Sequence, residues 1–167
     1  EGQAQNVDAT WKAGNTAWYT GTNWVGGAYP GLQGVAASNT NTATFTSAFT
    51  GTTVGINMAS GNSLNLGAIS LDPTRITATN IGDSSATPGS LRLYGATVNS
   101  VNNVILSNAG SGTLTLQAVQ AGTMTVALLN STANTIVISG TGGITISAVI
   151  SGSAKPLVFE GSGSGVL

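Results

Sequence analysis

A stretch of 62 residues, from Leu93 to Ala154, contains no Asp, Glu, Lys or Arg. The whole chain also lacks His and Cys. General acid–base catalysis, metal binding and activated nucleophiles normally use His, Cys or clustered carboxylates. The stretch instead interleaves Thr, Ser, Asn and Gly with Val, Ile, Leu and Ala, which is typical of β-structure that binds, stacks or scaffolds. We therefore expect no enzyme activity, no cofactor and no metal site.

The length and charge of the chain limit the kind of domain that it can form and the kinds of partner that it can bind. It has 167 residues, of which 41% are hydrophobic, so it can form one domain with a real core. Its net charge of −1 gives no basic stripe for nucleic acid. No run of 18 apolar residues is present, so we expect no membrane insertion. The Lys-poor composition, rich in Thr, Asn and Gly, favours an extracellular location.

Aromatic residues divide the chain into two zones. Seven of the nine lie within the first 49 residues, and only Tyr94 and Phe159 come later. We expect residues 1–50 to form an aromatic, turn-rich N-terminal cap segment. We expect residues 51–167 to form a continuous series of short strands that belongs to the same domain.

The second zone shows the period-2 alternation of apolar and polar residues that is typical of β-strands. Clusters of Gly, Ser, Asn and Asp separate the segments and predict turns. No window shows the apolar stripe of a helix, so essentially no helix is expected. The predicted strands are Ser63–Leu71, Ser90–Tyr94, Val104–Ser107, Thr113–Ala118, Thr123–Leu129, Thr135–Ser139, Gly143–Ile150 and Pro156–Phe159, and the predicted turns include Gly82–Ser85 and Gly140–Gly143.

Strands that recur every 8–12 residues permit a sandwich, a barrel or a solenoid. Three features favour the solenoid: small and similar side chains that can stack, almost no charges, and few large aromatic residues after residue 50. With about 20 residues per coil, residues 51–167 would make about five or six coils. The predicted fold class is therefore all-β, a parallel solenoid with an aromatic N-terminal cap.

The start of the chain carries a more specific pattern. It contains Trp11, Gly14-Asn15, Trp18, Asn23-Trp24, Pro30-Gly31 and Ala43-Thr44-Phe45 in that order. This pattern resembles the opening of bacterial surface proteins that are built from autotransporter-associated β-strand repeats. Two later segments, Ile146–Ser153 and Leu157–Leu167, resemble the same family's repeat.

The resemblance implies a right-handed parallel β-helix that is exported to the bacterial cell surface. It implies no catalytic residues. Family members usually continue through many more repeats, whereas this chain stops at Leu167, where another coil would begin. We therefore expect a fragment, a processed product, or a subunit whose open end is covered by something else.

Few residues are candidates for a site. Trp11, Trp18 and Trp24 are expected either to cap the first coil or to stack on glycan rings. Asp72 and Arg75 are the one close pair of opposite charges, and the Asp72-Pro73 sequence predicts a structural turn in which Asp72 accepts a backbone hydrogen bond. A calcium site at Asp72 and Asp83 would need further oxygens to converge.

The C-terminal edge is the remaining candidate. Leu157, Val158, Phe159, Val166 and Leu167 form a possible assembly edge, because little there would block a further strand. Our first hypothesis is an extracellular structural protein that self-associates into a filament or layer, with residues 1–8 able to supply a strand to a neighbour. The alternative is a monomeric adhesin or passenger fragment that binds a receptor or a host or matrix glycan.

Overall fold

The chain is all-β. The computed structural model describes residues 7–12, 17–34, 38–58, 63–85, 89–118, 124–152 and 155–164. In these ranges the chain forms sixteen β-strands and a single three-residue 3-10 helix, η1 (Gly21–Asn23), and contains no α-helix. The predicted class and the predicted lack of α-helix are therefore confirmed for the described residues.

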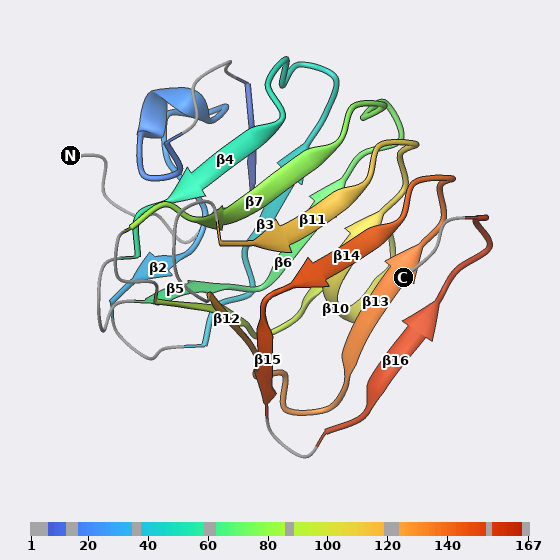
Figure 1. The fold of residues 1–167 in the computed structure, drawn as a ribbon. Helices are drawn as coiled ribbons and strands as arrows, with labels where there is room; N and C mark the ends of the chain where they lie inside the picture. Colours follow the sequence, from blue (N-terminus) through green and yellow to red (C-terminus); the bar gives the residue numbers. More distant parts are fainter. Residues whose placement is uncertain are drawn as a thin grey trace.

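The strands form three sheets that are mostly parallel (Figure 1). The pairs β2–β5 and β9–β10 are the antiparallel exceptions. The first sheet runs in the order β1 (Ala9–Thr10), β3 (Thr42–Phe45), β6 (Ala68–Leu71), β10 (Val101–Asn108), β13 (Asn134–Ile138) and β16 (Leu157–Glu160), with β9 (Ala96–Val98) paired to β10. The second sheet contains β4 (Thr53–Ile56), β7 (Thr79–Asp83), β11 (Leu114–Gln117) and β14 (Ile144–Ser147). The third contains β2 (Leu32–Gln33), β5 (Ser63–Leu66), β8 (Ser90–Leu93), β12 (Thr125–Leu128) and β15 (Val149–Gly152).

The chain visits the three sheets in rotation. It passes from the first to the second to the third sheet in β3–β4–β5, and repeats this path in β6–β7–β8, β10–β11–β12 and β13–β14–β15. We call each passage a coil, so the described residues contain four coils, after which β16 returns to the first sheet. Such a path fits a β-solenoid, because each coil pairs with the coils before and after it.

The coils are longer and less regular than the expected 20 residues. One row of the first sheet pairs Ala43, Ile69, Leu106, Ile136 and Phe159, which are separated by 26, 37, 30 and 23 residues. The expectation of five or six coils was therefore wrong. Long corner segments separate the first and second sheets, and the β9–β10 hairpin further lengthens the step before Leu106.

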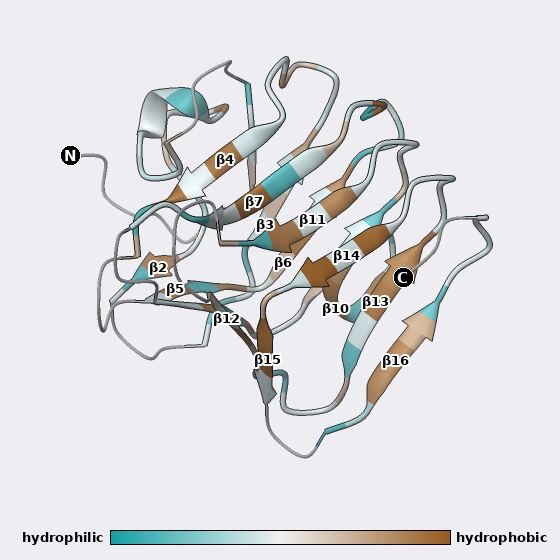
Figure 2. Ribbon diagram, viewed as in Figure 1, coloured by the Kyte–Doolittle hydropathy of each residue, from teal (hydrophilic) through white to brown (hydrophobic). Residues whose placement is uncertain are grey.

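The core lies between the three sheets and is built from rows of aliphatic side chains. In the third sheet Leu64 pairs with Leu91, and Leu91 with Val126; in the second, Val54 pairs with Ile81, and Ile81 with Leu116. All six side chains are fully buried. Figure 2 shows apolar segments on successive strands, among them β4, β7, β11 and β14. Similar residues stack in successive coils, as the composition predicted.

The structure corrects two strand predictions and one turn prediction. The predicted strand Ser63–Leu71 is two strands, β5 and β6, which lie in different sheets. Gly143–Ile150 likewise divides into β14 and the start of β15. Gly82 and Asp83 were predicted in a turn but end β7, because the buried Asp83 carboxylate accepts backbone N–H groups from neighbouring segments.

The predicted boundary after residue 50 has no counterpart in the first sheet. β3 lies before this boundary, yet all four of its residues pair in parallel with β6. The division into residues 1–50 and 51–167 stays a prediction, and the repeated layers begin at β3.

Candidate functional site: the two ends of the coil stack

The N-terminal end of the stack carries an aromatic cluster. Trp11 packs edge-to-face on Trp24 at 4.7 Å between ring centroids, and Trp24 on Trp18 at 4.8 Å. Phe45 and Phe49 extend the cluster into the first coil, with centroids 5.7 Å from Trp11. Edge-to-face contacts at these distances are favourable beyond the area that they bury.

The three indoles are fully buried, so none of their faces is exposed to a sugar ring. The Trp18 Nε1–H donates to the Pro30 carbonyl at 3.2 Å, and the Trp24 Nε1–H donates to the Trp18 carbonyl at 2.8 Å. The geometry therefore gives no support to glycan stacking by Trp11, Trp18 or Trp24. Their role as a cap stays a prediction.

Segments before residue 34 lie along the first edge of every sheet. β1 pairs with β3 in the first sheet, and β2 pairs with β5 in the third. In the second sheet Ala17 bridges to Gly55, and the Trp18 N–H donates to the Gly55 carbonyl at 3.0 Å. At this end, the strand edges of the first coil are therefore at least partly paired.

The opposite end is different. In the described part of the chain, no strand pairs with the outer edges of β14, β15 and β16. Two rows of the core become exposed when they reach this last layer, whereas Ile144 of β14 stays fully buried. Phe159 is 55% exposed although Ile136, its neighbour in the row, is 2% exposed. Ile150 is 50% exposed although Val126 is fully buried. We call this last layer the open end.

The open end has a shallow apolar hollow of about 410 Å³. Figure 2 shows apolar residues on β14, β15 and β16, the strands at this end. The hollow is lined by Ile136, Ile144, Thr145, Ile146, Ile150, Leu157 and Phe159. Charges beside it are limited, among the described residues, to the exposed Lys155 and Glu160. An apolar surface of this kind on a sheet edge is typical of an interaction site.

Part of the predicted assembly edge lies here. Leu157, Val158 and Phe159 belong to β16, whereas Val166 and Leu167 lie outside the described residues. The predicted edge did not include Ile150, which is half exposed and lines the hollow. The uncharged, β-prone sequence from Ile144 to Ile150 was the signal that could have identified it.

Asp72 and Arg75 both make hydrogen bonds that hold their corner of the chain together. The Asp72 carboxylate accepts the Thr74 N–H at 2.9 Å, which confirms the predicted turn. The buried Arg75 guanidinium donates to the Phe49, Gly51 and Ala78 carbonyls and to the Thr79 hydroxyl, and lies 4.6 Å from the Phe49 ring. Burial lowers the pKa of Arg75. This side chain therefore ties the corner between the first and second sheets together.

Asp83 is equally structural. Its carboxylate accepts the N–H groups of Met58, Ser85 and Gly89. Both oxygens are thus engaged by backbone donors rather than turned toward Asp72. Within the described ranges, no three metal-ligating side chains of the His, Cys, Asp and Glu types gather in one place.

No protein-family model, curated protein or solved structure matches this chain. The resemblance to autotransporter-associated repeats is therefore still a prediction. In the described segments, no helix is long and apolar enough to span a membrane.

Proposed function

We propose that this chain is a non-catalytic structural protein whose open end associates with a second copy. In this proposal the three sheets close into a right-handed parallel β-solenoid, and the aromatic cluster forms its N-terminal cap. The observation that carries the proposal is the exposure of the core rows at the open end. Apolar rows that are buried in the earlier coils would gain stability if a further layer covered their exposed last members.

The charges at the open end favour a second copy as that covering layer. Lys155 and Glu160 are both exposed and flank the β16 segment. If two β16 edges met in antiparallel orientation, each Lys155 would lie near Glu160 of the other copy. An in-register parallel contact would instead bring like charges together, which is unfavourable. We therefore propose a two-fold, end-to-end pair.

This geometry refines the filament hypothesis. A two-fold contact uses the same surface on both copies and closes, whereas a filament needs a head-to-tail contact. Growth into a filament or layer would then require a second contact elsewhere. Strand addition by residues 1–8 involves positions of which the structure describes only Val7 and Asp8. An extracellular or bacterial-surface location remains part of the proposal and is supported by the sequence resemblance and composition alone.

The alternative is a monomeric adhesin, and the residues that we first suggested for its glycan binding are not exposed. Trp11, Trp18 and Trp24 are buried, so they support a cap better than a glycan platform. A receptor-binding role would have to use another surface.

The test is the oligomeric state of the 167-residue chain by sedimentation velocity and light scattering over a range of concentrations. We expect a discrete dimer. Phe159→Asp should weaken dimerisation at least about tenfold, because an unpaired carboxylate would be buried twice per dimer. Ile76→Asp is the matched control, because Ile76 is 73% exposed and lies at a corner outside the open end. It should leave the dimer unchanged.

A chain that stays monomeric at high concentration would overturn the proposal. Open polymers would overturn the two-fold geometry and restore the head-to-tail filament. If Phe159→Asp and Ile76→Asp changed the dimer dissociation constant equally, the contact between the copies would not be at the open end.

A further inference from the structure

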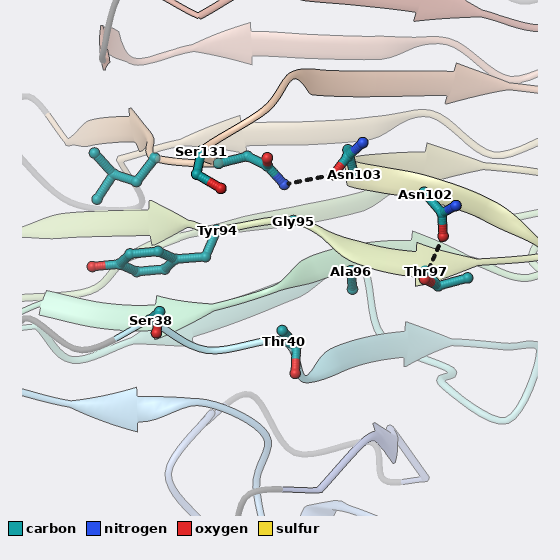
Figure 3. Close-up of a pocket in the computed structure, with 11 residues that line it drawn as sticks. Ser38, Thr40, Tyr94, Gly95, Ala96, Thr97, Asn102, Asn103 and Ser131 are labelled. Carbon is teal, nitrogen blue, oxygen red and sulfur yellow. Dashed lines mark hydrogen bonds between the residues drawn. The ribbon is translucent and has the colours of Figure 1, made fainter.

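An open groove of about 710 Å³ lies beside the β9–β10 hairpin, on the side of the coil stack (Figure 3). The hairpin is an insertion in the coil pattern. Only Ala68 separates Gly67 from Ile69 in β6. Gly95, whose N–H donates to the Gly67 carbonyl, is followed by residues 96–105 before Leu106 pairs with Ile69. One wall of the groove is therefore formed by residues of this insertion, which has no counterpart in the described parts of the other coils.

The backbone of the hairpin departs from ordinary strand geometry at its turn and at Asn103, which lines the groove. Asn99 and Ser100 have positive φ, as a two-residue hairpin turn of this type requires. Asn103 also has a positive φ of 62°, and the β9–β10 register shifts between Val101 and Val104. Bulges of this kind redirect side chains and are frequent beside functional sites.

Hydrogen bonds hold several of the groove side chains in place. The Asn130 amide oxygen accepts the Thr132 and Ala133 N–H groups, and its nitrogen donates to Asn103 Oδ1 at 3.4 Å. Across the hairpin, the Thr97 hydroxyl donates to Asn102 Oδ1 at 2.8 Å. No described residue accepts a hydrogen bond from the exposed Asn102 amide nitrogen. The groove thus presents a preorganised amide to solvent.

The lining of the groove narrows the class of ligand. Its residues supply hydroxyl and amide groups and include no Asp, Glu, Lys or Arg. A site without charges gives no counterion to a phosphate, a nucleotide or an acidic sugar. Tyr94, which is half buried, adds one aromatic ring. Amides and hydroxyls, together with one aromatic ring at one end of the groove (Figure 3), match a ligand with many neutral hydroxyl groups and apolar C–H faces.

We propose that this groove binds a neutral oligosaccharide. Asn102 and Thr97 hydrogen-bond sugar hydroxyls from one wall, Ser131 and Thr40 supply hydroxyls from neighbouring segments, and the Tyr94 ring packs against a sugar face. The volume lies within the range of small-ligand sites. This site is independent of the open end and of the association proposed there.

The test is a titration of the isotope-labelled chain, followed by amide NMR shifts, with the neutral tetrasaccharides cellotetraose, maltotetraose and chitotetraose. Tetragalacturonate serves as the acidic comparison, and a Ser/Gly-rich hexapeptide as the peptide comparison. We expect at least one neutral tetrasaccharide to shift residues 94–103 and 129–131. Asn102→Ala and Tyr94→Ala should each raise its Kd at least about fivefold. Asn57→Ala, an exposed asparagine outside the groove, should leave the Kd unchanged.

Absence of groove shifts with every neutral tetrasaccharide at about 10 mM, where even millimolar sites fill, overturns the proposal. Equal or tighter binding of tetragalacturonate overturns the neutral specificity, and preferential binding of the hexapeptide replaces the sugar by a peptide. Because Asn102 is exposed, a folded Asn102→Ala variant keeps the result interpretable even if Tyr94→Ala unfolds.

Discussion

Gly140 lies at the corner between β13 and β14 and stacks on Gly110 of the preceding coil. A Cβ at Gly140 would overlap the Gly110 carbonyl oxygen, and one at Gly163 would overlap the Gly140 carbonyl oxygen. Gly140→Ala should therefore lower the free energy of unfolding by about 1–3 kcal/mol, because backbone atoms must move. Denaturant unfolding measures this change. Thr141→Ala, at an exposed position in the same corner, should change it by less than about 0.5 kcal/mol; equal losses would contradict the stacking explanation.

The buried Tyr19 side chain should make the free energy of unfolding depend on pH in the alkaline range. Its buried hydroxyl has no partner in the described part of the structure. Burial, and to a smaller extent Tyr29 and Asp83, raises the pKa of Tyr19 far above its ordinary value of 10.0. Above about pH 10 the unfolded chain loses this proton while the folded chain keeps it, so the free energy of unfolding falls as pH rises.

Tyr19→Phe should remove that part of the alkaline decline. At pH 7 it should leave the free energy of unfolding unchanged or raise it by up to about 1–2 kcal/mol, because an unpaired buried hydroxyl is lost. Thermal unfolding between pH 7 and 11 measures both effects. Tyr94→Phe is the control and should retain the decline, because this variant still contains Tyr19. An alkaline decline in Tyr19→Phe as steep as in the unmodified chain would refute the assignment.

Single residues explain where sequence reasoning succeeded and where it could not. The turn at Asp72 was predictable, because an Asp-Pro pair bonds its own backbone locally. The roles of Asp83 and Arg75 were not, because their partners lie up to 26 residues away and come together only when coils stack. The same long-range packing buries the tryptophans and removes the stacking alternative.

At the scale of elements, apolar alternation located most later strands but not their sheets. It predicted Ser90–Tyr94 and Thr113–Ala118, and the structure has β8 and β11 there. It missed β4 and β7. It also left Ser63–Leu71 as one strand, although the alternation changes phase at Gly67, from Leu64 and Leu66 to Ile69 and Leu71. Alternation records which face of a strand is buried and carries no information on which sheet the strand joins.

The β9–β10 hairpin should be dispensable for the coil fold. Its apolar residues form a small cluster of Ala68, Ala96, Val98 and Val104 that is separate from the main core. Deletion of residues 96–104 joins Gly95 to Ile105 in the way that Gly67 joins Ala68. We expect this variant to keep its β circular-dichroism spectrum and cooperative unfolding. Deletion of nine residues across β12, 124–132, should instead unfold the chain; loss of cooperative unfolding in the hairpin deletion would show that the hairpin is integral.

At the scale of the whole molecule, the two ends of the stack are chemically different. Buried aromatic rings and added strands occupy the first end. Exposed apolar side chains occupy the other, where no described strand pairs with the outer edges of the sheets. The sequence predicted a poorly guarded C-terminal edge from its lack of charge. It could not show that Ile150 shares that surface, because the exposure of an inward row depends on whether another layer covers it.

Charge reversal tests the two-fold association most directly. Lys155→Glu and Glu160→Lys should each weaken the dimer, because each turns two attractions into two repulsions, and exposed pairs contribute about 0.2–1 kcal/mol each. The double variant exchanges the charges and should restore the dissociation constant that sedimentation equilibrium gives for the unmodified dimer. A double variant as weak as the single variants, or single variants that dimerise normally, would contradict the two-fold, end-to-end association.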